Sequence, residues 1–415
     1  MKRPCSSLPR RLALCLLTAS TLASTVSAST AAAQSKPRAR DLGVPFVGTP
    51  GPNNAITDVA GIQVGHTTLI RGEGELRVGE GPVRTGVTVI LPRADAPADP
   101  VFGGWFALNG NGEMTGTTWI EESGFLEGPI AITNTHSVGV VRDAIIAWQS
   151  DNGTAFQSWS LPVVAETYDG SLNDINGFHV KAEHLVAAIE NASSGPVREG
   201  NVGGGTGMRC LGFKCGIGTS SRAGLGEGEY TVGVLVQANF GGGRGLTIAG
   251  VPVGMVFANE QENGGVGGAS NDSEGGTAAV DFEIDLEREG RGSIIIVIAT
   301  DAPLLPHQLK RIARRASLGV ARTGGTSGNG SGDIFVAFST ANGGAAAARP
   351  TSEVTLLSNS QISSLFQATV EATEEAIINA MVAAETMVGR DGNRSEAIPL
   401  DRLRDVLRDY NRLND

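Results

Sequence analysis

The chain has 415 residues and a formal net charge of −11, with 32 basic against 43 acidic side chains. Such an acidic balance repels phosphate backbones and argues against nucleic-acid binding. Hydrophobic residues at 40% and charged residues at 18% exclude a disordered polyelectrolyte, while 58 glycines without a collagen-like period predict many tight turns.

The first 33 residues have the pattern of a secretory signal peptide. Basic residues precede an apolar stretch over 12–23, and small residues at 26–28 and 31–33 are typical of cleavage sites. The apolar stretch is too short to span a bilayer, so we expect no membrane anchoring. The Arg10–Arg11 pair leaves a twin-arginine route open, although its flanking residues match poorly. We expect an exported, periplasmic mature chain that begins near Gln34.

Strand-like and helix-like segments alternate from residue 61 onward. Apolar, β-branched runs bounded by turns predict strands over 85–91, 129–135, 230–237 and 293–299. Helical spacing of apolar residues predicts helices after Ser137, behind Pro303 and Pro306, from 362 to an end at Gly389, and from Leu400 onward. The strands show little polar alternation, which predicts burial on both faces in a layered helix–sheet architecture.

Two sequence features between these elements leave alternatives open. Cys210 and Cys215, the cysteines of the mature chain, either close a small loop in an oxidising compartment or remain separate thiols. Their spacing and that of the histidines do not fit a zinc site, so we expect no metal. The glycine-rich segment 260–277 predicts a flexible exposed loop, with a linker between domains as the alternative.

A Gly-Ser pair, Gly292–Ser293, stands at the head of the apolar strand predicted over 293–299. Glycine permits the backbone geometry that a self-cleaving bond requires. Cleavage between the two residues would make Ser293 a chain terminus. Its α-amine, with a reference pKa of about 7.7–8.0, would then act as the general base for its own hydroxyl. The alternative is an ordinary serine at a strand start.

Other catalytic arrangements have little support in the sequence. The five histidines are scattered, and no G-x-S-x-G nucleophile motif is present. The glycine run 200–207 lacks the lysine and hydroxyl residue of a phosphate-binding loop and predicts a tight turn or a pocket wall. Segment 109–116 predicts a hairpin turn or a loop that lines a site.

Several motifs, in order, resemble the DmpA/BapA family of self-processing serine aminopeptidases. They include NGNGEMTG at 109–116, NTHSV at 134–138, ETYDG at 166–170, VQANFG at 236–241, TDAPLLPHQ at 300–308 and GSGD at 330–333. The resemblance extends from about residue 38 to the C-terminus. It favours self-cleavage at Gly292–Ser293 within one catalytic domain, giving an α chain, 34–292, and a β chain, 293–415.

The resemblance implies a role for each matching residue. Ser293 matches the nucleophile, and Asn239 matches the side-chain amide that stabilises the oxyanion. Ser331 and Asp333 match a pair that orients the nucleophile and its amine. The family often carries glutamate at the second of these positions, so the shorter aspartate puts its reach to the amine in question. Tyr168 matches a tyrosine near the nucleophile.

Two further residues match the substrate pocket of the family. Glu166 matches the carboxylate that binds the free ammonium of the substrate, which offsets the cost of desolvating that charge. Trp159 matches an aromatic wall of the same pocket, and packing in the core is the alternative for this side chain.

The resemblance implies an α/β fold, a four-layer αββα sandwich similar in layout to the N-terminal nucleophile hydrolases but differently connected. It also implies homo-oligomers of αβ units, tetramers or octamers, without a cofactor. We expect an enzyme that removes N-terminal β-amino acids from short peptides and amides through an acyl-enzyme. The alternatives are an L-aminopeptidase/D-amidase-esterase, a self-processing acyltransferase of the ornithine acetyltransferase type, and a non-catalytic binding protein.

Overall fold

The computed structural model describes residues 36–262 and 291–414. The predicted signal peptide lies outside the described residues, and so does the predicted glycine-rich loop beyond residue 262. Within the described part of the chain, no helix is both long and apolar enough to cross a membrane.

Two β-sheets form the centre of the fold. The first has the order β1-β2-β5-β6, with β1 Gln63–Arg71, β2 Val83–Leu91, β5 Ile130–Asn134 and β6 Val163–Thr167. The second has the order β4-β3-β12-β11-β10-β9, with β4 Phe125–Leu126, β3 Val101–Gly110, β12 Gly330–Ser339, β11 Arg291–Thr300, β10 Tyr230–Asn239 and β9 Ile217–Leu225. All four strands predicted from β-branched runs are confirmed.

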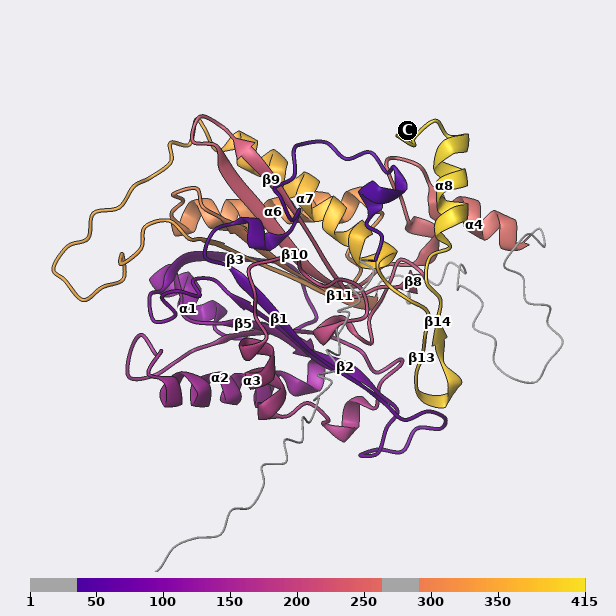
Figure 1. The fold of residues 1–415 in the computed structure, drawn as a ribbon, viewed down its shortest axis with the longest axis horizontal. Coiled ribbons are helices and arrows are strands. Elements are labelled where there is room, and N and C mark those ends of the chain that lie inside the picture. The colour runs from indigo at the N-terminus through magenta and orange to yellow at the C-terminus, as the bar shows by residue number, and fades with distance from the viewer. Residues whose placement is uncertain (1–35, 263–290, 415) are drawn as a thin grey trace, which may run out of the picture. The chain divides into compact units, whose positions relative to one another are not determined.

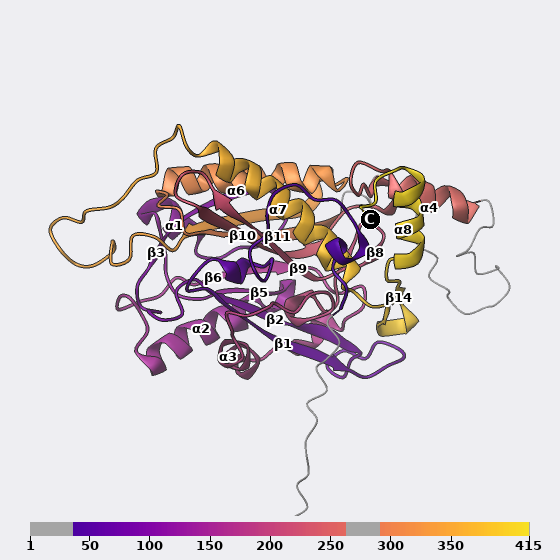
Figure 2. The ribbon, with the colours of Figure 1, turned by 45° about the horizontal axis from the view of Figure 1, so that its top comes forward.

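Helices cover the outer face of each sheet (Figures 1 and 2). Helices α2 (Val138–Asn152) and α3 (Ala182–Glu190) pack on the four-stranded sheet. Helices α6 (Pro306–Arg322) and α7 (Ser363–Val382) pack on the six-stranded sheet. The predicted four-layer αββα sandwich is confirmed. The fold also contains two short helices, α1 (Thr117–Ser123) and α4 (Val253–Glu262), and the C-terminal helix α8 (Leu400–Asp409). It has two small hairpins, β7–β8 (Arg209–Cys210, Phe213–Lys214) and β13–β14 (Met387–Val388, Arg394–Ser395).

Strand β11 shows how the layers are held together. Its even-numbered isoleucines, Ile294, Ile296 and Ile298, join the apolar core beneath α6 and α7. Its alternate residues Ile295 and Val297 join the core between the two sheets. Because side chains alternate across a strand, one run of apolar residues serves both cores. The predicted burial on both faces is confirmed.

Two predicted boundaries differ from the structure. Helix α7 ends at Val382, before the predicted end at Gly389. The reason is tertiary: the Asn201 side chain accepts a hydrogen bond from the Glu385 backbone N–H at 3.0 Å and donates one to its carbonyl oxygen at 2.7 Å, which draws this backbone out of the helix. The start of the predicted loop 260–277 is also wrong, because Glu260 lies in α4.

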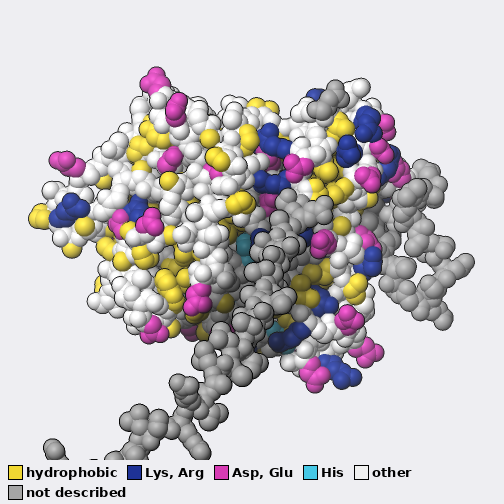
Figure 3. Space-filling view, viewed as in Figure 1, with side chains coloured by type: hydrophobic (Ala, Val, Ile, Leu, Met, Phe, Trp, Pro, Cys, Tyr) yellow, Lys and Arg dark blue, Asp and Glu magenta, His cyan; other side chains and the backbone are white. Residues whose placement is uncertain are grey.

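Helix α8 fixes that end of α4 through charge. The Arg402 Nε of α8 donates to Oε1 of Glu260 at 3.1 Å. Figure 3 shows acidic and basic side chains mixed over the face in view, and they gather around α8. The Arg402–Glu260 pair is partly exposed, so its contribution to stability is small.

Candidate active site

The strand topology brings the predicted catalytic residues to one end of the six-stranded sheet. Strands β11 and β12 are parallel, so both begin at this end, whereas the antiparallel neighbour β10 ends there. Ser293 of β11 is consequently paired with Asn239 of β10 on one side and with Gly332 of β12 on the other. A serine hydroxyl and a side-chain amide that are far apart in sequence thus lie side by side on adjacent strands.

Ser293 is buried and faces the layer between the two sheets, on the same side of β11 as Ile295. Its Oγ accepts a hydrogen bond from the Gly332 backbone N–H at 3.3 Å. A side chain on Gly332 would lie 2.5 Å from the Asn111 carbonyl oxygen. Glycine at this position therefore lets the loop after β3 lie directly on β12, beside the serine hydroxyl.

Gly292 has the backbone geometry that a glycine was expected to supply. Its φ is 133°, a value that L side chains rarely adopt, and a Cβ there would lie 2.3 Å from the Asn239 carbonyl oxygen. The bond between Gly292 and Ser293 is therefore held in a conformation that is open only to glycine.

Ser331 and Asp333 are buried on β12, and Ser331 Oγ donates to Asp333 Oδ1 at 2.7 Å. Burial raises the pKa of Asp333, while the hydrogen bond from Ser331 opposes this shift. The pair is in register with Gly292 and Ile294, hence on the opposite face of the sheet from the Ser293 side chain. Among the described residues, no hydrogen bond joins either side chain to Ser293 Oγ. Both instead flank the Gly292–Ser293 peptide.

The Asn239 carboxamide is fixed in orientation from both ends. Its Oδ1 accepts the Arg209 backbone N–H at 2.9 Å, and its Nδ2 donates to the Tyr168 carbonyl oxygen at 3.0 Å. A carboxamide nitrogen carries two hydrogens, so one donor remains after this bond. Asn239 and Ser293 are register partners, so their side chains share one face of the sheet.

Glu166 lies near the end of β6, in the other sheet. Its Oε1 accepts the Glu113 backbone N–H at 3.0 Å, and its Oε2 accepts the Thr135 hydroxyl. Burial raises the pKa of this carboxyl. A Cβ on Gly112 would lie 3.2 Å from Oε1 and 3.1 Å from the Gly332 Cα, so only this glycine backbone separates the carboxylate from β12.

The two predicted aromatic residues differ in their relation to this site. Tyr168 contributes its carbonyl oxygen to Asn239, and its ring packs over Gly170, with 49% of the residue exposed. Trp159, between α2 and β6, is 59% exposed, so its alternative role in core packing is wrong. Within the described residues, no hydrogen bond or ring contact joins Trp159 to the other site residues. Its role as a pocket wall stays a prediction.

Sequence reasoning missed the groups that hold these side chains in place. The Gly332 and Arg209 contacts are made by backbone N–H groups, which leave no residue-type signal. Thr135 and Glu113 lie inside the motifs 134–138 and 109–116. The motifs therefore indicated the segments but not that these two residues donate hydrogen bonds to Glu166. The described residues include no group of three or more histidine, cysteine, aspartate or glutamate side chains placed to hold a metal ion.

Comparison with known proteins relates this geometry to a family. The model of peptidase family S58 matches residues 54–395. The chain is 54% identical to the β-peptidyl aminopeptidase BapA of Sphingosinicella microcystinivorans, over 92% of this chain and 95% of that protein. It is 46% identical to the BapA of Sphingosinicella xenopeptidilytica, over 92% and 94% of the two chains.

A solved structure is similar over the same extent. It is the L-aminopeptidase D-Ala-esterase/amidase of Ochrobactrum anthropi, described as a variant of the Ntn hydrolase fold. The TM-score is 0.79 at 48% identity, and the match covers 91% of this chain and all of that one. These findings confirm the predicted resemblance and the predicted fold class. The chain belongs to peptidase family S58.

Proposed function

We propose that this chain is an exported, self-processing aminopeptidase that removes N-terminal β-amino acid residues from short peptides and amides. The observation that carries the proposal is the strand register that sets Ser293 opposite Asn239, with the Gly332 N–H on its hydroxyl. The names of the two Sphingosinicella relatives support the β-amino acid substrate class. We further propose that residues 1–33 direct export to the periplasm, and that αβ units assemble into tetramers or octamers.

Self-cleavage activates the enzyme in this proposal. Ser293 Oγ attacks the Gly292 carbonyl carbon to form an ester, the C–N bond breaks, and the hydroxyl proton passes to the departing nitrogen. That nitrogen is then the free α-amine of Ser293. Water then hydrolyses the resulting ester, which restores the hydroxyl and leaves a carboxylate on Gly292. The φ of 133° at Gly292 and the buried Ser331–Asp333 pair beside this peptide support the assignment.

Turnover uses the same atoms on a substrate. Ser293 Oγ attacks the carbonyl of the substrate's first residue and gives its proton to the Ser293 α-amine, which passes it to the departing amine. Water completes the reaction by hydrolysing the ester. The second Nδ2 hydrogen of Asn239 stabilises the oxyanion, and such preorganised donors typically contribute about 10²–10³-fold in rate. Glu166 binds the substrate ammonium, so blocked N-termini are rejected.

The position of Ser331 and Asp333 favours the Ser293 amine as general base over a relay through Ser331. Both side chains lie in register with the residues before and after Ser293, on the face opposite its hydroxyl. On that face they lie beside the Gly292–Ser293 peptide and away from Oγ. We therefore assign them the orientation and charge stabilisation of the amine.

The experiment that tests the proposal compares the wild type with Ser293→Ala. From 42.7 kDa for the whole chain, cleavage predicts fragments of about 27 and about 13 kDa. We expect these two chains, a new N-terminus at Ser293 and hydrolysis of β-alanyl p-nitroanilide in the wild type. The variant should remain one inactive chain. A single uncut chain with full activity would overturn the mechanism.

The similarity to the Ochrobactrum enzyme supports a second candidate, an L-aminopeptidase with D-amidase and esterase activity. Both candidates use the same nucleophile and differ in the spacing between ammonium and carbonyl. The ratio of kcat/KM for β-alanyl and L-alanyl p-nitroanilide separates them. A large preference for the L-alanyl substrate would favour the second candidate.

A further inference from the structure

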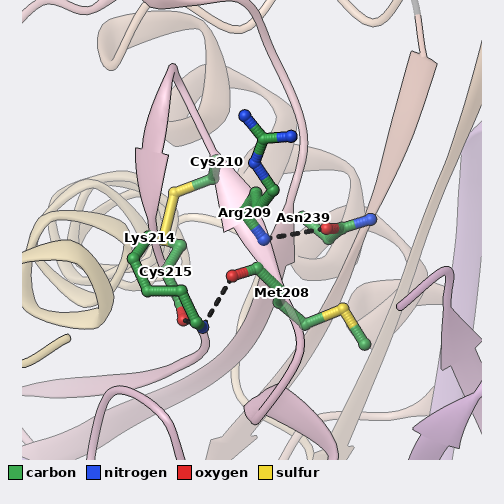
Figure 4. The surroundings of a disulfide bond; sticks show 6 residues. All are labelled: Met208, Arg209, Cys210, Lys214, Cys215 and Asn239. Atoms are coloured by element: carbon green, nitrogen blue, oxygen red, sulfur yellow. Dashed lines mark hydrogen bonds between the residues drawn. A yellow bond between two sulfur atoms is a disulfide. The ribbon is translucent and has the colours of Figure 1, made fainter. Parts of the chain in front are cut away.

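A disulfide-closed hairpin lies against the strand end that carries Asn239 (Figure 4). Cys210 and Cys215 are bonded, with their Cα atoms 5.4 Å apart, so the loop alternative holds for this pair. The bond links Cys210 of β7 to Cys215, the residue directly after β8, and is buried in the core beneath α6 and α7.

Three hydrogen bonds attach this hairpin to consecutive residues of β10 and its exit. The Ala238 N–H donates to the Gly216 carbonyl oxygen at 2.9 Å, and the Leu211 N–H donates to the Phe240 carbonyl oxygen at 2.8 Å. Between them, the Arg209 N–H donates to Asn239 Oδ1 at 2.9 Å. The hairpin thus holds both the backbone around Asn239 and its side chain.

A buried lysine closes the base of the hairpin a second time. Lys214 is fully buried, and its Nζ donates to the Met208 carbonyl oxygen at 2.7 Å and to that of Cys215 at 2.6 Å. The Cys215 N–H also donates to the Met208 carbonyl oxygen, at 3.1 Å. Figure 4 shows Met208, at the start of the hairpin, beside Arg209 and its bond to Asn239. Both closures fix the residue that precedes the Arg209 N–H.

Together with the Tyr168 carbonyl oxygen, the Arg209 N–H determines the orientation of the Asn239 carboxamide. The terminal torsion of asparagine is broad and nearly two-fold, so an unrestrained amide exchanges its oxygen and nitrogen positions readily. With Oδ1 held by Arg209, the donor group Nδ2 points to the opposite side, toward the Tyr168 carbonyl oxygen. In the reversed orientation, the amide oxygen would lie there and repel a developing oxyanion.

We propose that the Cys210–Cys215 hairpin is a positioning element that selects the oxyanion-stabilising orientation of Asn239. The inference rests on the proposed function, since it assigns Asn239 that role. The disulfide acts by removing alternative conformations of the hairpin, as a cross-link does for any short loop. Opening the disulfide weakens the stabilisation of the transition state and leaves substrate binding through Glu166 unchanged.

The test uses the processed wild-type enzyme and a reductant, tris(2-carboxyethyl)phosphine, with thiol labelling and mass analysis to quantify opened disulfide. We expect kcat for β-alanyl p-nitroanilide to fall in proportion to opening, by about 10²-fold when opening is complete, because the oxyanion donor of Asn239 is then displaced. We expect KM to stay within about twofold, since ground-state binding is untouched.

The double variant Cys210→Ser/Cys215→Ser should reproduce the loss of kcat and should not respond to reductant. Val406→Ala in α8 serves as a stability control, because it removes buried apolar atoms from the same core without touching the hairpin. It should lower the unfolding midpoint and leave kcat unchanged.

Wild-type activity that survives complete opening of the disulfide would overturn the positioning role. The positioning role would also be overturned if the cysteine variant changed both kcat and KM, and Val406→Ala changed them equally at the same unfolding midpoint. Absence of hydrolysis by the oxidised wild type would instead refute the proposed function. The two failures are therefore distinguishable.

Discussion

The substitution Gly292→Ala tests whether the backbone at the cleavage site is built for self-processing. A Cβ at this position would lie 2.3 Å from the Asn239 carbonyl oxygen and 2.8 Å from the Phe240 Cα, against ordinary contacts from 3.4 Å upward. Residue 292 or the end of β10 must therefore move by about 1 Å, and a misplacement of that size costs on the order of 10²-fold where reacting atoms must be aligned.

We therefore expect Gly292→Ala to slow self-cleavage by about a hundredfold. The strained φ should also reduce the free energy of unfolding of the uncut chain by about 1–3 kcal/mol. The assay follows the conversion of one chain into two over time by intact mass, with thermal unfolding of the uncut chain measured in parallel.

Gly110→Ala is the matched control. Gly110 is the register partner of Gly332 on β3, and a Cβ there would meet no atom within 4 Å. This variant should be processed at the wild-type rate. Cleavage of Gly292→Ala at that same rate would refute the reasoning, because the clash would then have no consequence for the alignment of Ser293 with the scissile carbonyl.

Three other predictions follow from buried charges. Glu166→Gln should raise KM for free-amine substrates at least about tenfold. It should also remove one of two ionisations from the acidic side of the kcat/KM profile: the one due to Glu166, which lies above the usual carboxyl range because burial raises the pKa of this group. The ionisation of the Ser293 amine should remain. Burial raises the pKa of Asp169 to about 6, so the folded state binds this proton more tightly than the unfolded chain. Stability from this group should thus fall by about 3 kcal/mol as pH rises from about 4 to about 6, and urea unfolding of Asp169→Asn should lack that fall. Glu375→Gln should lower the free energy of unfolding by about 3–5 kcal/mol, because it weakens the buried pairs with Arg40 and Arg222, and denaturant titration checks this value.

The sequence was most informative where a signal is local. The apolar run after Gly292 identifies a strand because its β-branched residues are contiguous, and burial on both faces follows from its lack of polar alternation. The end of α7 was predicted wrongly because it depends on Asn201, a residue far along the chain whose side chain captures the Glu385 backbone. A local sequence pattern cannot predict a contact between residues so far apart in the chain.

The same distinction applies to the candidate site. Gly292–Ser293 was identifiable from adjacent residues, and Glu166 and Asn239 came from motifs shared with a family. The order of strands, which places β11 between β10 and β12, was not available from spacing. Neither were the N–H groups of Gly332 and Arg209, since every residue except proline carries one and only the fold decides which of them is used.

Strand β11 has a different role on each of its faces at the site. Toward the four-stranded sheet it presents the Ser293 hydroxyl, beside Asn239 and near the loop that Glu166 holds. On the other face, Ser331 and Asp333 lie in register with the residues that flank Ser293. In the proposed mechanism, side-chain alternation therefore separates the groups assigned to the substrate from those assigned to the nitrogen. Because a serine whose own amine is the base needs support at both its oxygen and its nitrogen, a strand start flanked on both sides meets that need without a histidine.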